Sequence, residues 1–170
     1  MAKLRRIIKK GRVVSTRKGD FVLSLSKKVV SWLKPYVKRI EIVGSIRRKA
    51  KNPVDIDLVI IPKNKESKEK INNLLRKKGN VLEEGEQQAS FKIQGVKVEI
   101  YYTTAEEWGA TLLAYSSEFG AGIGLRVVAK KKGFKLNQHG LWKGNRRVAG
   151  RTEEEIYRAL GRSYKEPLER

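Results

Sequence analysis

The sequence predicts an α+β fold, with a mixed or antiparallel sheet, flanking helices and a small C-terminal lobe of helices and a β-hairpin. Two observations support this prediction. The hydrophobic pattern indicates the order helix, two strands, helix and three strands, followed by helices and one hairpin. The length of 170 residues suits one compact domain or two small lobes that share a chain.

The N-terminal part begins with a basic arm over residues 1–19, with a short strand at Val13-Val14. We expect Asp20 to cap a helix over residues 21–33, and Pro35 to end it. Its inner face is expected to carry Phe21, Leu25, Val29 and either Trp32 or Leu33.

Strands are expected at residues 40–43 and 54–61, with a turn at Gly44-Ser45 after the first of them. The second becomes wholly apolar, which is typical of a central strand. A charged helix over 66–78 and strands at 81–84, 89–94 and 96–102 complete a region that we assign to residues 20–104.

Residues 105–170 are assigned to the C-terminal lobe. Thr104 and Glu107 form a capping-box pattern before a helix through Leu112-Leu113, and a second helix is expected over 118–132. Residues 134–136 and 141–142 flank a turn and predict a hairpin. Thr152 with Glu155 predicts the start of a last helix, which ends near residue 160.

The composition is strongly basic, with 39 Lys and Arg against 18 Asp and Glu, a net charge of +21 and a pI near 10.3. Such an excess predicts a polyanionic partner, and nucleic acid is favoured. An anionic membrane surface is the alternative, but the charge is spread along the chain instead of lying beside an apolar helix. The absence of cysteine excludes disulfides, thiol nucleophiles and cysteine metal sites.

Asp55 and Asp57 lie two residues apart in a predicted strand, so their carboxylates project to one face. Two like charges beside an apolar run are unfavourable unless a cation compensates them. Glu99 takes a polar position in the alternating stretch 96–100, and it would add a third carboxylate if the two strands were neighbours. We therefore expect these residues to bind two Mg²⁺ ions roughly 3.5–4 Å apart, with Mn²⁺ as a substitute. The alternative for an isolated pair is a solvated strand face.

Gly44-Ser45 lies ten residues before this pair and strengthens the functional interpretation. A glycine after a buried strand lets the backbone approach a phosphate, and Ser45 adds a hydroxyl donor. Arg47 and Arg48 supply cations at the same place. The segment is therefore expected to bind phosphate next to the carboxylates.

The motifs Ile-Val-Gly-Ser-Ile-Arg-Arg (42–48) and Val-Asp-Ile-Asp-Leu-Val-Ile (54–60) together resemble the palm signature of the family X DNA polymerases, the relatives of DNA polymerase beta. Leu125-Arg126 and Lys-Gly-Phe-Lys-Leu-Asn (132–137) resemble the family's nucleotide- and template-contacting segment. The resemblance spans residues 20–145. It implies a nucleotidyltransferase palm and one nucleotide-selecting lobe, as in the smallest viral members.

The resemblance implies roles for individual residues. Asp55, Asp57 and Glu99 would be the catalytic metal ligands. Gly44, Ser45 and Arg48 would hold the β and γ phosphates. The nucleotide site would further include Tyr115, Arg126 and Asn137.

Three positions depart from the family pattern. The third carboxylate is usually Asp, whereas Glu99 is one methylene longer. The family's Tyr-Phe-Thr-Gly segment is Ala114-Tyr-Ser-Ser117 here, and Gly122 stands where a base-contacting Asn is usual. These differences bear on metal geometry, and Ala114 is expected to leave space near the sugar and weaken the exclusion of ribonucleotides.

Several basic and aromatic residues of the lobe are expected to contact DNA: Lys130, Lys131, Lys132, His139, Trp142, Lys143, Arg146 and Arg147. His139, the single histidine, is expected to be exposed in a polar turn or to touch nucleic acid. The stretch 120–124, Gly-Ala-Gly-Ile-Gly, suits either a helix-hairpin-helix turn or a plain helix start. It does not suit a dinucleotide fingerprint, because no strand precedes it.

These observations predict a template-directed DNA polymerase that fills gaps by two-metal-ion catalysis. Its partners would be gapped or primer-template DNA and deoxynucleoside triphosphates, and we expect a monomer. No apolar run could span a bilayer and no secretory signal is evident, so an intracellular location is expected, in cytoplasm, nucleoid or viral factory. One alternative is a nucleotidyltransferase of the same superfamily that acts on another acceptor. The other is a catalytically weak DNA-binding module, because Glu99 replaces the usual Asp.

Overall fold

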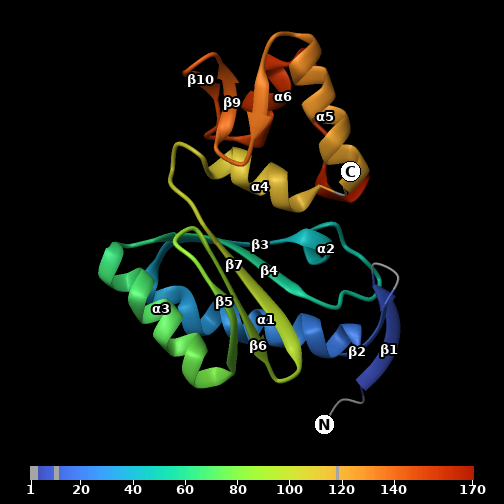
Figure 1. Cartoon of the computed structure of the whole chain (residues 1–170), viewed down its shortest axis with the longest axis vertical. Coiled ribbons are helices and arrows are strands. Elements are labelled where there is room, and N and C mark those ends of the chain that lie inside the picture. The colour runs from blue at the N-terminus through green and yellow to red at the C-terminus, as the bar shows by residue number, and fades with distance from the viewer. Residues whose placement is uncertain (1–3, 10–11, 118) are drawn as a thin grey trace. The chain divides into compact units, whose positions relative to one another are not determined.

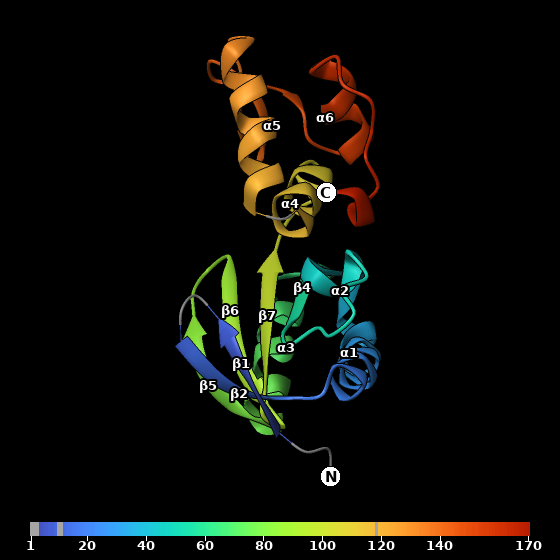
Figure 2. The same ribbon diagram turned by 90° about the vertical axis from the view of Figure 1, so that its right-hand side faces the viewer.

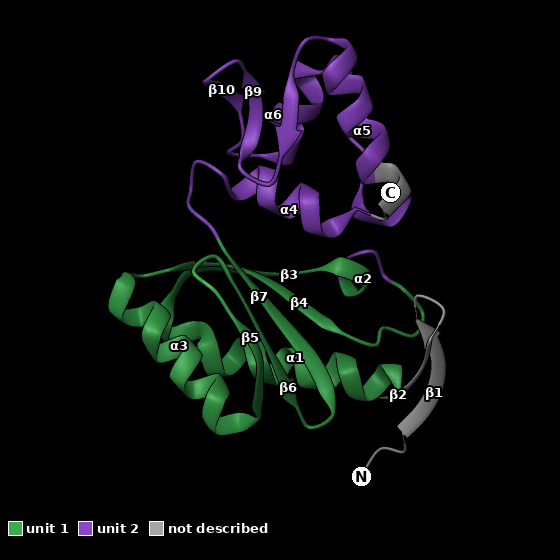
Figure 3. Cartoon of the chain, in the orientation of Figure 1, with its two compact units in different colours: residues 1–46, 50–102 green, residues 47–49, 103–170 purple. Residues whose placement is uncertain are grey.

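The computed structural model describes residues 4–9, 12–117 and 119–170, with side chains for 18–117 and 122–170 (Figure 1). It divides into two compact units (Figure 3). Unit 1 contains residues 1–46 and 50–102, and unit 2 contains residues 47–49 and 103–170. The α+β fold class is confirmed.

Unit 1 is built on a five-stranded mixed sheet. The strands run in the order β3-β4-β7-β6-β5, and β4 and β7 pair in parallel while the other neighbours are antiparallel. Figure 2 shows β4, β7, β6 and β5 side by side. The strands are β3 (Val37–Val43), β4 (Ile56–Pro62), β5 (Asn80–Glu84), β6 (Gln88–Ile93) and β7 (Val96–Tyr102). The helices are α1 (Gly19–Leu33), a 3-10 turn (Lys34–Tyr36), α2 (Gly44–Arg47, whose last residue belongs to unit 2) and α3 (Lys65–Lys78).

The N-terminal arm contains two strands where one short strand was expected. β1 (Leu4–Lys9) and β2 (Arg12–Arg17) pair in an antiparallel register.

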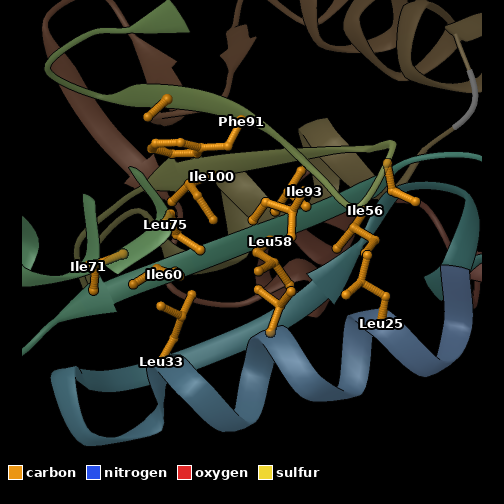
Figure 4. Packing of buried hydrophobic residues seen from close by; sticks show 14 of the residues in the cluster. Leu25, Leu33, Ile56, Leu58, Ile60, Ile71, Leu75, Phe91, Ile93 and Ile100 are labelled. Carbon is orange, nitrogen blue, oxygen red and sulfur yellow. The ribbon is translucent and has the colours of Figure 1, made fainter. Parts of the chain in front are cut away.

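The core of unit 1 lies between the sheet and helices α1 and α3, which cover one face of it (Figure 4). Leu25, Val29 and Leu33 are buried on α1, as the helical spacing predicts. Alternate residues of β4 and β7 point into the same core, among them Ile56, Leu58 and Ile100. The intervening residues of these two strands therefore face the other side of the sheet.

Two of the predicted helix starts are wrong. Helix α1 begins at Gly19, so Asp20 lies in its first turn and Lys18 is at the cap without a side-chain hydrogen bond. Helix α4 begins at Trp108, and Glu107 at its cap is helical in backbone angle and makes no cap hydrogen bond. The first residue of each helix therefore differs from the one that its capping pattern predicted.

Unit 2 consists of three helices and a three-stranded antiparallel sheet of order β10-β9-β8. The elements are α4 (Trp108–Ser116), α5 (Phe119–Lys131), β8 (Lys135–Asn137), β9 (Gly140–Lys143), β10 (Arg146–Ala149), α6 (Glu153–Ala159) and a 3-10 turn (Pro167–Glu169). The expected hairpin is β8–β9, and β10 was not predicted. Thr152 caps α6 as predicted, because its hydroxyl accepts from the amide of Glu155 at 3.1 Å.

The core of unit 2 joins α4, α5, α6 and the small sheet through Leu113, Ala129, Leu141, Ile156 and Leu160. Gly109 allows α4 to approach the backbone just before α6, because a Cβ there would lie 2.2 Å from the carbonyl carbon of Thr152. Gly122 and Gly124 lie inside helix α5, so the helix-hairpin-helix turn is not formed. Among the residues that the structure describes, no helix has the length and hydropathy required to cross a bilayer.

Candidate active site

The structure brings Asp57 and Glu99 side by side. Strands β4 and β7 pair in parallel with Asp57 opposite Glu99, on the face of the sheet that α1 and α3 do not cover. Asp55 precedes the first residue of β4, and it is partly buried like the other two carboxylates. The strand of Glu99 therefore lies beside the strand of Asp57, which is the condition for a three-carboxylate cluster.

Gly44 lies against the carboxylate of Asp57. Val43, the last residue of β3, pairs with Asp57, and the next residue turns into α2 with a φ of +65°. A Cβ at residue 44 would lie 2.3 Å from Oδ2 of Asp57, so both the backbone angle and the available space require glycine. The glycine of the Gly-Ser motif thus allows the start of α2 to contact a catalytic candidate.

Glu99 is held by two side chains from its own strand. Lys97 forms an ion pair with Oε1, and the hydroxyl of Tyr101 donates to Oε2. Burial by itself would raise the pKa of Glu99, but the hydrogen bonds from Lys97 and Tyr101 and the ammonium charge outweigh it and lower this pKa below its usual value. Glu99 is therefore an ionised carboxylate at neutral pH.

The pKa of Lys97 responds to all three predicted carboxylates. Its pKa is raised, first by the hydrogen bond to Glu99 and further by the negative charges of Glu99, Asp55 and Asp57. The negative charges of all three predicted carboxylates therefore act on one ammonium group, as expected for side chains that share one face of the sheet.

The residues fit a hard divalent cation in their chemistry, since they offer carboxylate oxygens. Within the described part of the chain, however, no three His, Cys, Asp or Glu side chains stand in an arrangement that could hold a metal. Both oxygens of Glu99 contact Lys97 or Tyr101 instead. The metal-ligand role of Asp55, Asp57 and Glu99 remains a prediction.

Tyr101 is the residue of this cluster that sequence reasoning missed. Its hydroxyl donates to Glu99 and lies 3.4 Å from Oδ1 of Asp57. The available signal was its position two residues after Glu99, which places both on one face of the strand.

Arg47 and Arg48 bind groups of unit 2. The guanidinium of Arg47 contacts both carboxylate oxygens of Glu153, at 2.5 and 3.0 Å, and donates to the hydroxyl of Ser116 at 2.8 Å. Arg48 donates to the carbonyl oxygen of Ser116 at 3.3 Å. The charge of Arg47 is paired with Glu153 here, so the expectation that it provides a cation for phosphate remains a prediction.

Arg126 and Asn137 line a common pocket within unit 2, together with residues of α4 and α5. The other lining residues include Ala114, Ser117 and Gly122, whereas Tyr115 is not among them. The two residues expected to contact the nascent base pair are therefore brought together. Two of the positions that depart from the family pattern, Ala114 and Gly122, open onto the same pocket.

Glu107 links three of the residues expected to contact DNA. Its carboxylate pairs with Nδ1 of His139 and with Arg147, each at 3.1 Å, and the Arg147 guanidinium lies 4.8 Å from the centre of the Trp142 ring. His139 is partly buried, so of the two expectations for it the exposed side chain is not met, and contact with nucleic acid remains a prediction. Arg147 and Trp142 are likewise engaged within unit 2.

The remaining basic candidates are solvent-exposed. Lys130 and Lys131 end helix α5 and Lys132 follows it, while Lys143 and Arg146 lie around the turn between β9 and β10. These side chains can reach a polyanion without first breaking an ion pair of the kind seen at Arg147. Their contact with DNA remains a prediction.

The mixed sheet, with Asp57 and Glu99 on its central parallel strands and the glycine turn against Asp57, defines a nucleotidyltransferase fold of the DNA polymerase beta type. Residues 122–170 match the family described as DNA polymerase beta thumb. Three relatives are each named "Repair DNA polymerase X" and come from African swine fever virus. That of strain Badajoz 1971 Vero-adapted is 30% identical over 171 residues, covering 95% of this chain and 91% of the relative.

The relative from isolate Pig/Kenya/KEN-50/1950 is 32% identical over 142 residues, which cover 78% of this chain and 82% of the relative. The protein of isolate Tick/Malawi/Lil 20-1/1983 is 29% identical over 170 residues, with 95% and 91% covered. The chain belongs to the family X DNA polymerases.

Proposed function

We propose that the chain is a template-directed DNA polymerase that adds deoxynucleotides to a primer 3′-hydroxyl and fills gaps in DNA. The observation that carries this proposal is the register that sets Asp57 opposite Glu99 on parallel strands, with Asp55 close enough to raise the pKa of the same lysine. The names of the viral relatives and the net charge of +21 support a nucleic-acid substrate.

Asp55, Asp57 and Glu99 would hold Mg²⁺. When bound, the ions would activate the attacking hydroxyl and neutralise charge on the triphosphate and the leaving pyrophosphate. Gly44 permits the backbone of Ser45 to approach the phosphates, and Ser45 adds a hydroxyl donor. Arg48 supplies a cation once its side chain exchanges the Ser116 carbonyl for a phosphate oxygen.

In the same proposal, residues 20–104 are the palm and residues 105–170 the nucleotide-selecting lobe, with residues 1–19 as a basic arm. Arg126, Asn137 and Tyr115 serve the nascent base pair, and the pocket shared by Arg126 and Asn137 supports this role for the first two. The exposed cations of unit 2, Lys130, Lys131, Lys132, Lys143 and Arg146, would hold the DNA backbone. Mn²⁺ would serve as a substitute for Mg²⁺ at the carboxylates.

Primer extension on gapped DNA tests the proposal, with the four deoxynucleotides offered singly against each template base. We expect incorporation to follow the template and to require Mg²⁺ or Mn²⁺. The matched variant is Asp57→Asn, which keeps the size of the side chain and removes its charge, and should lose activity by about 10³-fold or more because a metal ligand is lost. Equal inactivity of wild type and variant with both metals would instead assign a DNA-binding module. Incorporation that ignores the template would favour a nucleotidyltransferase with another acceptor.

A further inference from the structure

Tyr101 presents a fixed hydroxyl to the carboxylate cluster. Its side chain is 8% exposed, and its partner across the parallel pair of strands is Val59, which is fully buried. The hydroxyl donates to Oε2 of Glu99 and lies 3.4 Å from Oδ1 of Asp57. The ring therefore has little freedom, and the position of its oxygen is set by the sheet.

The two carboxylates need such a group. Asp57 and Glu99 stand directly opposite each other on neighbouring strands, where like charges repel. Glu99 also has one more side-chain torsion than an aspartate, so holding it in one conformation costs additional entropy. A donor that contacts both side chains limits their movement away from each other.

Lys97 is less suited to this task than Tyr101. The lysine side chain is 41% exposed, flexible and positively charged, so it holds Glu99 loosely and reduces the negative charge available to another cation. The tyrosine hydroxyl is neutral and rigidly held. It can fix the carboxylate while leaving the charge of the cluster unchanged.

We propose that Tyr101 is a positioning residue that holds Glu99 next to Asp57, in the arrangement in which the two carboxylates receive a divalent cation. The inference rests on the proposed function, in which these carboxylates are metal ligands. Tyr101 itself contacts neither metal nor substrate in this role and acts through Glu99 and Asp57.

Direct metal binding by the full chain tests the inference. In a Mn²⁺ titration followed by electron paramagnetic resonance, Tyr101→Phe should weaken Mn²⁺ binding about tenfold, the scale expected for one hydrogen bond to a charged group. In steady-state incorporation of one nucleotide at a fixed, subsaturating metal concentration, kcat should fall while KM for the deoxynucleotide stays unchanged. Circular dichroism and urea unfolding would show whether the variant is folded.

Tyr102→Phe is the matched control. The hydroxyl of Tyr102 donates to Asn72 at 2.6 Å, and its side chain points to the opposite face of β7. Its removal should leave Mn²⁺ binding unchanged. If wild type bound Mn²⁺ and Tyr101→Phe bound it equally well, the inference would be overturned and the proposed function would stand. If wild type bound no Mn²⁺ and extended no primer, both would fall.

Discussion

Glu99 in unit 1 and Glu153 in unit 2 are both shielded carboxylates with two donor side chains, but their charges are compensated to different degrees. Glu153 is 4% exposed and faces two guanidinium groups: Arg47 contacts both oxygens, and Arg170, which is 1% exposed, approaches to 2.5 Å. Glu99 is 17% exposed and has one exposed lysine, a neutral tyrosine hydroxyl and a second carboxylate beside it.

This difference suits Glu153 to a structural role and Glu99 to the functional role proposed for it. A buried carboxylate held by two arginines is fully compensated, so it stabilises the packing around it and has no need of another cation. The cluster around Glu99 sets three carboxylates near one lysine, an arrangement that suits it to receive a cation from solution. The same residue type is thus suited to different tasks by its neighbours.

The largest effect is expected at Glu153. Glu153→Gln would remove the carboxylate that both Arg47 and Arg170 contact, and should lower the free energy of unfolding by about 3–5 kcal/mol. Urea unfolding, monitored by tryptophan fluorescence, would measure this change in the free energy of unfolding. Glu154→Gln, at an exposed position of the same helix, is the control and should change stability by less than about 0.5 kcal/mol. If Glu153→Gln and Glu154→Gln changed stability equally, Glu153 would not be a structural charge.

Gly44→Ala is expected to have the next largest effect. The positive φ alone costs a non-glycine residue about 1–2 kcal/mol, and the new methyl group would displace the carboxylate of Asp57. Gly144→Ala separates these causes, because Gly144 has a φ of +60° and a methyl group there would meet no other part of the chain within 4 Å. We expect both variants to lose stability and only Gly44→Ala to lose primer extension. Retained activity in Gly44→Ala would contradict the close contact with Asp57.

Glu99→Gln should separate stability from activity. The variant loses a partly exposed ion pair, and solvent screening limits the cost to less than about 1 kcal/mol. Primer extension should nevertheless be abolished or strongly reduced, since one of the proposed metal ligands becomes neutral. Urea unfolding and single-nucleotide incorporation on the same preparations would check this. A destabilisation as large as that of Glu153→Gln would show that Glu99 is a structural charge after all.

The smallest effect is expected for single exposed cations. Arg146 is exposed, whereas its neighbour Arg147 is paired with Glu107. Arg146→Ala should lower the slope of log affinity against log salt for gapped DNA by about 0.7–0.9, the value for one lost phosphate contact. Arg147→Ala should leave the slope unchanged and lower stability instead. Fluorescence anisotropy over a salt series would distinguish the two, and equal slopes for Arg146→Ala and wild type would remove Arg146 from the DNA-binding surface.

Sequence reasoning predicted the elements whose signals are local. The helical spacing of Leu25, Val29 and Leu33, the alternation around Glu99 and the Thr152 cap all agree with the structure. Strand β10 was missed because its four residues carry little periodicity. The failed caps at Asp20 and Thr104 show that packing can move a helix start by a few residues.

The part of the site that depends on distant residues could not be predicted in this way. Arg47 and Glu153 are 106 residues apart, and no local pattern indicates that they pair. The contact of Arg47 with Glu153 was missed for this reason. Tyr101 was within reach of strand alternation, but only the parallel register of β4 and β7 shows that its hydroxyl meets Asp57 as well as Glu99.

Unit 2 is discontinuous in the chain, because residues 47–49 belong to it while the segments before and after them belong to unit 1. A fragment cut at residue 103 would therefore lack Arg47 and leave Glu153 with Arg170 alone. Formation of this ion network requires closure of a loop of about a hundred residues, which carries an entropic cost. Unit 2 can therefore complete this ion network only after residues 47–49 have joined the rest of the unit.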